Sequence, residues 1–382
     1  MNVPKLRFKE FNDEWKKIQL DSFVDINPKN DSLPEQFIYI DLESVNNGIL
    51  TTRKIINKSE APSRAQRTIK ENDILYQTVR PYQMNNLFVK NFDSDYPYIA
   101  STGYALLRTK ENPYFVYSIL YQKSFVNKVL DMCTGTSYPA ISANDLGTIT
   151  VGLPSLKEQE KISKTLELLD KKIELQSKKI EALKLFKKGL NKNIFSNLNN
   201  KFKIGDLIIE YNEKTSTNNQ YEVLSSTANG IILQNEYFNT HIASSNNIGY
   251  KVIPRGFMTY RSMSDTGEFH FNIQNITECG IVSPAYPVFT VNENIVDKNY
   301  FAYYINENKS FKNKILSSKE GGTRYALSIS KFKDIKLDLP SLKFQKKYAK
   351  LLIAYNQKTK QEDNKLCKLQ KLKKGLMQSM FV

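Results

Sequence analysis

Side chains that could read the edges of nucleic-acid bases gather in one short run of this 382-residue chain. The segment ILYQTVRPYQMNN contains Tyr76, Gln77, Thr78, Arg80, Tyr82 and Gln83. Arginine and glutamine form paired hydrogen bonds with guanine and adenine, whereas hydroxyl groups suit phosphates. Arg64 and Arg67 lie a few residues upstream in a basic stretch. The region is a candidate DNA-contacting loop, and the alternative is a strand edge with one exposed arginine.

A second group of such residues follows in the other half of the chain. It repeats the Thr-x-Arg pattern and comprises Thr259, Tyr260, Arg261 and Ser262. Two glycine-led loops recur as well, GTSY with Thr136, Ser137 and Tyr138, and GTRY with Thr323, Arg324 and Tyr325. Their amides and hydroxyls could position a phosphate, or the loops could be structural turns.

The common catalytic patterns are missing. There is no Gly-x-Gly-x-x-Gly, no Walker A loop and no Gly-x-Ser-x-Gly. His241 and His270 are the two histidines, and the three cysteines lie far apart without zinc-site spacing. Asn112-Pro113-Tyr114 faintly resembles part of the Asn-Pro-Pro-aromatic motif of adenine methyltransferases, but we interpret it as a loop that enters a helix. We expect no catalytic residue and no metal site in this chain.

The net charge of +16 is concentrated in two segments. Residues 154–195 contain 11 lysines against six acidic residues, and residues 340–382 contain 11 against two. These segments carry +5 and +9, which is 14 of the 16 net charges. Such a surplus favours a polyanion or an acidic protein as partner, whereas lysines that only solvate helix faces are the alternative. The chain has no apolar run of about 20 residues and no signal peptide at its start, so we expect it to be cytoplasmic.

The two basic segments are copies of each other. Residues 153–195 recur as residues 339–381, an offset of 186, with LPSLK and KKGL intact in both. A helix should begin after the proline of each LPSL, because the residue before a proline favours extended backbone. Ser155 is expected to cap the first helix, with Glu158 completing a capping box. Forty helical residues form a rod of about 60 Å.

Apolar residues step by three and four positions along both segments, which predicts a heptad-like seam. The middle of the seam is polar, with Gln176, Thr359 and Glu362. Two matched rods favour packing on each other, and the alternative is two amphipathic helices on separate cores. The predicted helix-pair interface comprises Ile162, Leu166, Leu169, Ile173, Ile180, Leu183 and Leu190, and Tyr348, Leu352, Tyr355, Leu366, Leu369 and Leu376.

The duplication extends into the globular parts. Asn47-Gly48 and Asn229-Gly230 each predict a hairpin, and residues 114–130 and 300–316 both look helical. Residues 56–100 and 238–280 share almost nothing, which is typical of binding loops on a common scaffold. We therefore predict an α+β protein of two tandem α/β domains and two long helices, with boundaries at 1–153, 154–195, 196–339 and 340–382. Residues 196–203 are expected to link the halves.

Aromatic and arginine side chains also suit single strands or RNA. The tandem plan favours duplex DNA, because two related domains on a stiff spacer can reach two short sites on one duplex. Sites on the same face lie about 34 Å apart, or a multiple of that. The length of the helices would then set the gap between the two half-sites.

In its doubled order of motifs the whole chain resembles the specificity subunits of type I restriction–modification systems. The resemblance rests on VPKLRFKEF…W near the start, on ILYQTVRP, on GTSYPAIS, and on the LPSLKEQEKI start and KKGL…F end of the helices. It implies two target-recognition domains, each reading one half of a split DNA sequence. It also implies two conserved helical regions that pack as an antiparallel coiled coil.

The resemblance further implies partners and a division of labour. Two modification subunits would dock on the helices and methylate adenine at N6, and restriction subunits would join them. The methyl donor, ATP and Mg would bind those partners, so this chain would need no cofactor and would not be an enzyme. The alternative is a coiled-coil scaffold that binds partners without reading DNA sequence.

Overall fold

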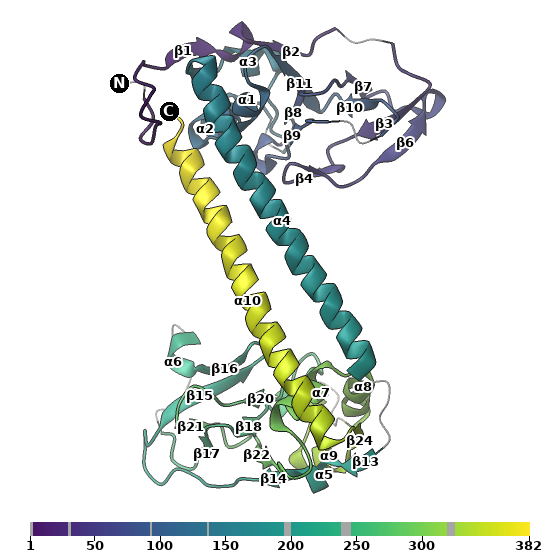
Figure 1. Ribbon diagram of the computed structural model, residues 1–382, viewed down its shortest axis with the longest axis vertical. Helices are drawn as coiled ribbons and strands as arrows, with labels where there is room; N and C mark the ends of the chain where they lie inside the picture. The colour runs from purple at the N-terminus through teal and green to yellow at the C-terminus, as the bar shows by residue number, and fades with distance from the viewer. Residues whose placement is uncertain are drawn as a thin grey trace. The chain divides into compact units, whose positions relative to one another are not determined.

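The computed structural model describes residues 3–29, 32–91, 94–135, 137–194, 200–237, 246–318 and 325–382. The chain divides into two compact units. The first comprises residues 1–178 and 364–382, and the second comprises residues 179–363. Both long helices therefore contribute to both units (Figure 1).

The first unit contains two four-stranded sheets. One has the order β6-β3-β10-β7, with bounds Lys54–Asn57, Gln36–Ile40, Tyr98–Ser101 and Ala65–Thr68. The other has the order β2-β11-β8-β9, with bounds Val24–Ile26, Tyr104–Thr109, Ile74–Gln77 and Leu87–Phe88. Two small antiparallel pairs complete the unit, β1 (Lys16–Gln19) with β12 (Thr150–Leu153), and β4 (Val45–Asn46) with β5 (Ile49–Leu50).

The second unit repeats the strand orders of both four-stranded sheets. One sheet has the order β16-β15-β21-β17, with bounds Gly230–Leu233, Glu222–Thr227, Cys279–Val282 and Lys251–Pro254. The other has the order β14-β22-β18-β20, with bounds Ile208–Glu210, Val288–Val291, Met258–Thr259 and Asn272–Ile273. The small pairs are β13 (Asn200–Lys203) with β24 (Lys336–Leu339), and β19 (Met263–Ser264) with β23 (Tyr325–Ala326). The duplication seen in the sequence is thus a duplication of fold.

Several local predictions are confirmed, and the predicted linker is wrong at one end. Asn47 and Gly48 form the turn that connects β4 to β5, with φ angles of 48° and 78°, which suits a type I′ hairpin. The second hairpin pairs Thr227 with Gly230 across its turn. The predicted linker 196–203 is incorrect at its end, because residues 200–203 form strand β13 against β24. Residues 196–199 lie outside the described part of the chain.

Short helices cover the sheets. The segment predicted helical around residue 114 forms two helices, α1 (Pro113–Ile119) and α2 (Lys123–Met132), and the Asn112 side chain caps α1 through the Phe115 amide. Its repeat likewise forms α7 (Lys298–Glu307) and α8 (Lys309–Ser318). The other short helices are α3 (Ala143–Thr148), α5 (Ile204–Leu207), α6 (Gln234–Tyr237) and α9 (Ile329–Asp334), with 3-10 turns at Leu20–Ser22, Lys58–Glu60 and Pro81–Gln83.

The two long helices are α4 (Leu156–Ile194) and α10 (Leu342–Ser379). They pack together antiparallel: Asp170 of α4 lies 2.5 Å from Lys373 of α10, and Lys179 lies 3.0 Å from Glu362. The predicted capping box is wrong, because the Glu158 carboxylate accepts both the Nε–H and the Nη2–H of Arg7 at 2.8 Å.

None of the predicted seam residues is exposed. The ends of the helices, however, pack in the domain cores. Ile162 and Leu166 join the core of the first unit, together with the chain end at Met380 and Phe381. In the second unit Leu352 packs in the core and Leu190 and Tyr348 pack against it. The ends of the two helices thus pack on separate domain cores, as the alternative prediction had it, whereas their middle parts pack on each other along the seam.

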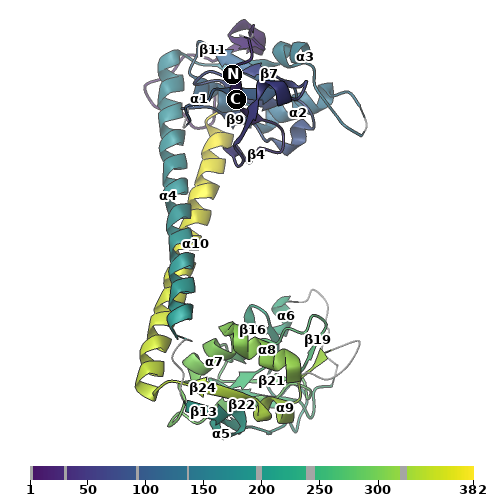
Figure 2. The same ribbon diagram turned by 90° about the vertical axis from the view of Figure 1, so that its right-hand side faces the viewer.

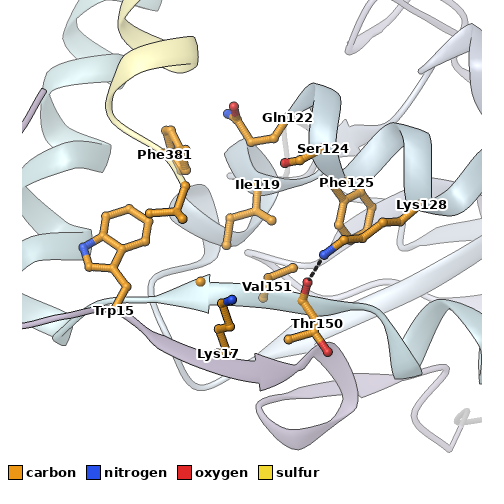
Figure 3. A pocket seen from close by; sticks show the side chains of 12 residues that line it. Trp15, Lys17, Ile119, Gln122, Ser124, Phe125, Lys128, Thr150, Val151 and Phe381 are labelled. Carbon is orange, nitrogen blue, oxygen red and sulfur yellow. Dashed lines mark hydrogen bonds between the residues drawn. The ribbon is translucent and has the colours of Figure 1, made fainter. Parts of the chain in front are cut away.

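The two chain ends meet in the first unit (Figure 2). The Leu6 amide donates to the Ser379 carbonyl at 2.8 Å, and Phe381 stacks on Phe115 and meets Trp15 edge-on. A cavity of about 390 Å³ beside this contact is lined by Trp15, Phe125 and Phe381 (Figure 3). The C-terminus of α10 is thereby anchored on the domain that begins the chain.

Candidate nucleic-acid interface

Burial removes several predicted contact residues from the surface. Tyr76 lies in the first core with its ring edge-on to Phe125, and Tyr260 is 0% exposed among Phe271 and Phe332. Thr78 and Thr259 are also buried, and each hydroxyl donates to a backbone carbonyl, that of Gly103 at 2.8 Å and that of Pro287 at 2.7 Å. The prediction that these four residues contact DNA is wrong.

Gln77 is also misassigned, because its side chain is buried and its hydrogen bonds lie within the protein. Its Nε2 donates to the Val79 carbonyl at 2.8 Å and to Gln83 Oε1 at 2.7 Å. Its Oε1 accepts from the Asn85 amide at 3.1 Å. Gln77 therefore braces the loop that follows strand β8 and does not face a ligand.

That loop meets the GTSY loop, although about 55 residues separate them in the sequence. The Arg80 amide donates to the Pro139 carbonyl at 2.8 Å, and Val79 forms a β-bridge with Ala140. The Arg80 guanidinium lies over the Tyr138 ring, 4.4 Å from its centroid. Tyr82, Gln83, Ser137 and Tyr138 are exposed beside it. The structure thus brings two of the predicted segments together on one surface, while Thr136 lies outside the described residues.

Two residues of this loop have left-handed backbone. Arg80 has φ 54° and ψ 55°, and Met84 has φ 51° and ψ 34°. This conformation costs an ordinary side chain roughly 1–2 kcal/mol, so the surrounding contacts must enforce it. Besides the Gln77 bonds, the Tyr121 hydroxyl donates to the Met84 carbonyl at 3.3 Å. The loop is held in one strained conformation, and such strain clusters at functional sites.

Apart from Arg53, charge pairing separates the described arginines into two groups. Arg7, Arg108 and Arg255 bind carboxylates at 2.6–2.8 Å. No carboxylate of the described residues lies within ion-pair distance of the second group, which comprises Arg64, Arg67, Arg80 and Arg261. Of the five arginines predicted to contact DNA, these four are described, and their guanidinium charge is available to an external anion.

Arg64 directly precedes strand β7, and Arg67 lies on it. The Arg64 carbonyl accepts from the Thr102 amide at 2.9 Å, and the neighbouring Gly103 carbonyl accepts from Thr78. Arg64 is exposed, whereas burial lowers the pKa of the half-buried Arg67 guanidinium. The Nε of Arg67 is buried without a hydrogen-bond partner. Arg64 is therefore the better placed of the two to reach a ligand.

The second unit builds its surface from different residues on the same scaffold. The Leu327 amide donates to the Ser262 carbonyl at 2.9 Å, and Ser264 pairs with Tyr325, so the GTRY loop again meets the Thr-x-Arg segment. Thr323 and Arg324 fall outside the described ranges. Arg261 is exposed and Tyr325 is half-buried.

A cavity of about 370 Å³ opens at Arg261. Hydroxyl and charged side chains line it, many from residues that the sequence did not single out: Ser225, Ser226, Thr227, Ser264, Asp265, Thr266, Glu268, His270 and Tyr286. Burial raises the pKa of the Tyr286 phenol, and the nearby Arg261 charge opposes that shift. The hairpin predicted at Asn229-Gly230, which follows Ser225, Ser226 and Thr227 in the chain, is the sequence signal that points to this wall.

The described residues contain no cluster of His, Cys, Asp or Glu able to hold a metal ion. Within the same ranges, no helix is long and apolar enough to cross a membrane. The surfaces around Arg80 and Arg261 instead offer cations, hydroxyls and aromatic rings, a combination that binds phosphates and bases.

Comparison with known proteins agrees with the duplicated fold. A family model described as the type I restriction modification DNA specificity domain matches residues 12–185 and again residues 197–371. The chain belongs to this family. The two matches coincide with the two halves of the duplication, so each half of the chain is one specificity domain.

One curated relative is the type I restriction enzyme HindI specificity subunit of Haemophilus influenzae. It is 27% identical over 164 residues, which cover 41% of this chain and 35% of that protein. The match thus spans about a third of the relative's length.

Two solved structures share the fold along the chain. The type I restriction–modification S subunit from M. genitalium aligns with a TM-score of 0.59 at 17% identity, covering 100% of this chain and 99% of that one. A chain from a study of complex assembly and conformational transition of the type I R-M system aligns with a TM-score of 0.51 at 20% identity, covering 95% and 96%. At these identities the likeness shows the fold alone.

Proposed function

We propose that this chain is the sequence-specific DNA-recognition subunit of a type I restriction–modification complex. Each globular domain reads one half of a bipartite target, and the helix pair sets the gap between the halves. DNA as its ligand would place the chain in the cytoplasm.

One observation carries the proposal. Two domains of the same fold each present an arginine without a carboxylate partner, Arg80 in the first and Arg261 in the second, beside hydroxyl and aromatic side chains. The side chains around the two arginines differ although the scaffold does not. A shared scaffold with unlike contact surfaces suits two unlike half-sites on one duplex.

The same role defines the partners. Two modification subunits would dock on the helices and transfer a methyl group to adenine N6, and restriction subunits would add translocation and cleavage. The methyl donor, ATP and Mg would bind those subunits, and this chain would contribute recognition without catalysis. Docking is supported by two exposed apolar residues seven positions apart on α4, Leu168 and Leu175, which lie outside the seam.

The test is to express the chain with its modification subunit in a host that lacks the system, and to map N6-methyladenine across the host DNA. We expect methylation in a split motif with two defined halves and a fixed gap. Omitting this chain while keeping the modification subunit is the control. An assembled complex that leaves the methylation pattern unchanged would contradict the proposal.

The lysine-rich helices support one other candidate, a scaffold that binds acidic partners without reading sequence. Filter binding of the assembled complex to duplexes of unrelated sequence separates the two. Equal affinity for every duplex at one salt concentration would favour the scaffold.

A further inference from the structure

We propose that Arg80 reads a guanine in the half-site bound by the first domain, and that Tyr138 positions its guanidinium for this contact. The inference rests on the proposed DNA-recognition function. It goes beyond that function by assigning one base to one side chain and by giving Tyr138 a role that acts through Arg80.

The contact with Tyr138 occupies one side of the Arg80 guanidinium. The Tyr138 ring lies against the guanidinium at 4.4 Å from the ring centroid, and Tyr138 itself is 64% exposed. When a guanidinium contacts a ring through its planar face, its N–H donors point outward in the plane and remain usable. No described carboxylate lies within ion-pair distance of those donors. The group is therefore oriented and charged, with its donors available.

The backbone beneath Arg80 is fixed on both sides. Its amide donates to the Pro139 carbonyl at 2.8 Å, and its carbonyl accepts from the Gln83 amide at 3.0 Å. The buried Gln77 side chain and the Tyr121 hydroxyl hold the rest of the loop. Since the loop is ordered before any ligand binds, little conformational entropy is lost on binding, which suits a specific contact.

Guanine is the base that this group fits best. Its O6 and N7 are two adjacent acceptors in the major groove, and a planar pair of arginine donors matches them. Gln83, the neighbouring candidate for adenine, already accepts from Gln77 through Oε1 at 2.7 Å. Adenine recognition needs both an acceptor and a donor from the amide. Arg80 is thus the reading side chain of this loop.

The experiment compares variants of the full chain, assembled with its modification subunits, on a pool of duplexes in which both half-sites are randomised. The variants are Arg80→Lys, Arg80→Asn, Tyr138→Phe and Tyr138→Leu. Asparagine is included because it tolerates left-handed backbone, so the loop keeps its conformation. Arg255→Lys is the matched control, because Arg255 is an exposed arginine that already pairs with Glu278 at 2.7 Å. Thermal unfolding of each variant checks that the first domain folds.

We expect Arg80→Asn to lose preference at one guanine of one half-site by roughly tenfold to a hundredfold, with the other half-site unchanged. Arg80→Lys, whose ammonium group can also donate to guanine O6 and N7, should lose less of this preference. Tyr138→Leu should weaken the same preference by about threefold to fivefold. Tyr138→Phe keeps the aromatic ring and should therefore keep the preference. Arg255→Lys should bind as the wild type does.

Three results would overturn the inference. Arg80→Asn could keep every base preference, it could lose affinity equally for all sequences, as loss of a phosphate contact would cause, or Tyr138→Leu could leave the preference for the guanine intact. These outcomes differ from failure of the proposed function, because in that case the wild-type complex itself would select no sequence from the pool.

Discussion

The carboxylate of Glu362 is the charge buried most deeply between the long helices. It is 0% exposed and lies 3.0 Å from the ammonium groups of both Lys179 and Lys358, whose side chains are 50% and 49% exposed. The exposure is thus unequal: the anion is buried and the cations reach water. Removing the anion and removing the cations should therefore have opposite consequences.

Replacing both lysines by methionine would leave a buried carboxylate without a cation. Breaking a buried ion pair in this way costs about 3–5 kcal/mol, and water can approach through the positions of the half-exposed lysines, so we expect about 3 kcal/mol. Glu362→Leu instead removes the buried charge and returns two ammonium groups to water. That change should be neutral or stabilising.

Amide hydrogen exchange along residues 355–366 of α10 measures the local effect, because exchange there requires the helix to open. The double variant Lys179→Met/Lys358→Met should exchange about 100-fold faster, which corresponds to about 3 kcal/mol. Lys360→Met, at an exposed position of the same helix, is the control and should change little. Faster exchange in Glu362→Leu than in the double lysine variant would refute the reasoning.

Three further predictions follow from burial, helix propensity and ionisation. Tyr260→Ala should destabilise the second domain by about 3–5 kcal/mol in urea unfolding, whereas Arg261→Ala should weaken DNA binding and leave unfolding unchanged; the reverse result would contradict the assignments. Gly189→Ala and Gly375→Ala add a methyl group with no atom within 4 Å, so each should raise the melting temperature by stabilising its helix up to about 1 kcal/mol. Burial raises the pKa of the Tyr304 phenol to about 12, above the unfolded value near 10. The unfolded chain then releases its proton first, so stability should fall as pH rises from 10 to 12, with tyrosine ionisation at 295 nm coinciding with loss of helix signal.

The duplicated architecture could be predicted because the signals for it repeat. An offset of 186 residues carries the same helix starts and seam pattern into both halves, and the strand orders of the two units match. The sequence also showed that the centre of the seam is polar, but it did not show which of the polar side chains there is buried. That Glu362 is enclosed and paired with two lysines depends on the register of the two helices, which the pattern of one helix does not give.

The candidate surface was predicted only in part. Strand β8 lies between β11 and β9 in its sheet, and its side chains are buried on both faces. Its sequence ILYQ therefore lacks the alternation of apolar and polar residues that would have shown which side chains point into the protein. The same holds for Thr259 and Tyr260 in the repeat. Arg80 and Tyr138 were found by residue type, yet their stacking depends on a β-bridge between segments far apart in the sequence. Asp265 and His270 come from a loop without a counterpart in the first half, so no repeat pointed to them.

The most direct test of the account exchanges residues 1–150 for the first domain of another family member and maps the methylated motif of the assembled complex. If each domain reads one half-site, the exchange should change one half of the motif and leave the other half and the gap as they were. A change in both halves, or in neither, would contradict the claim that the two domains read DNA separately.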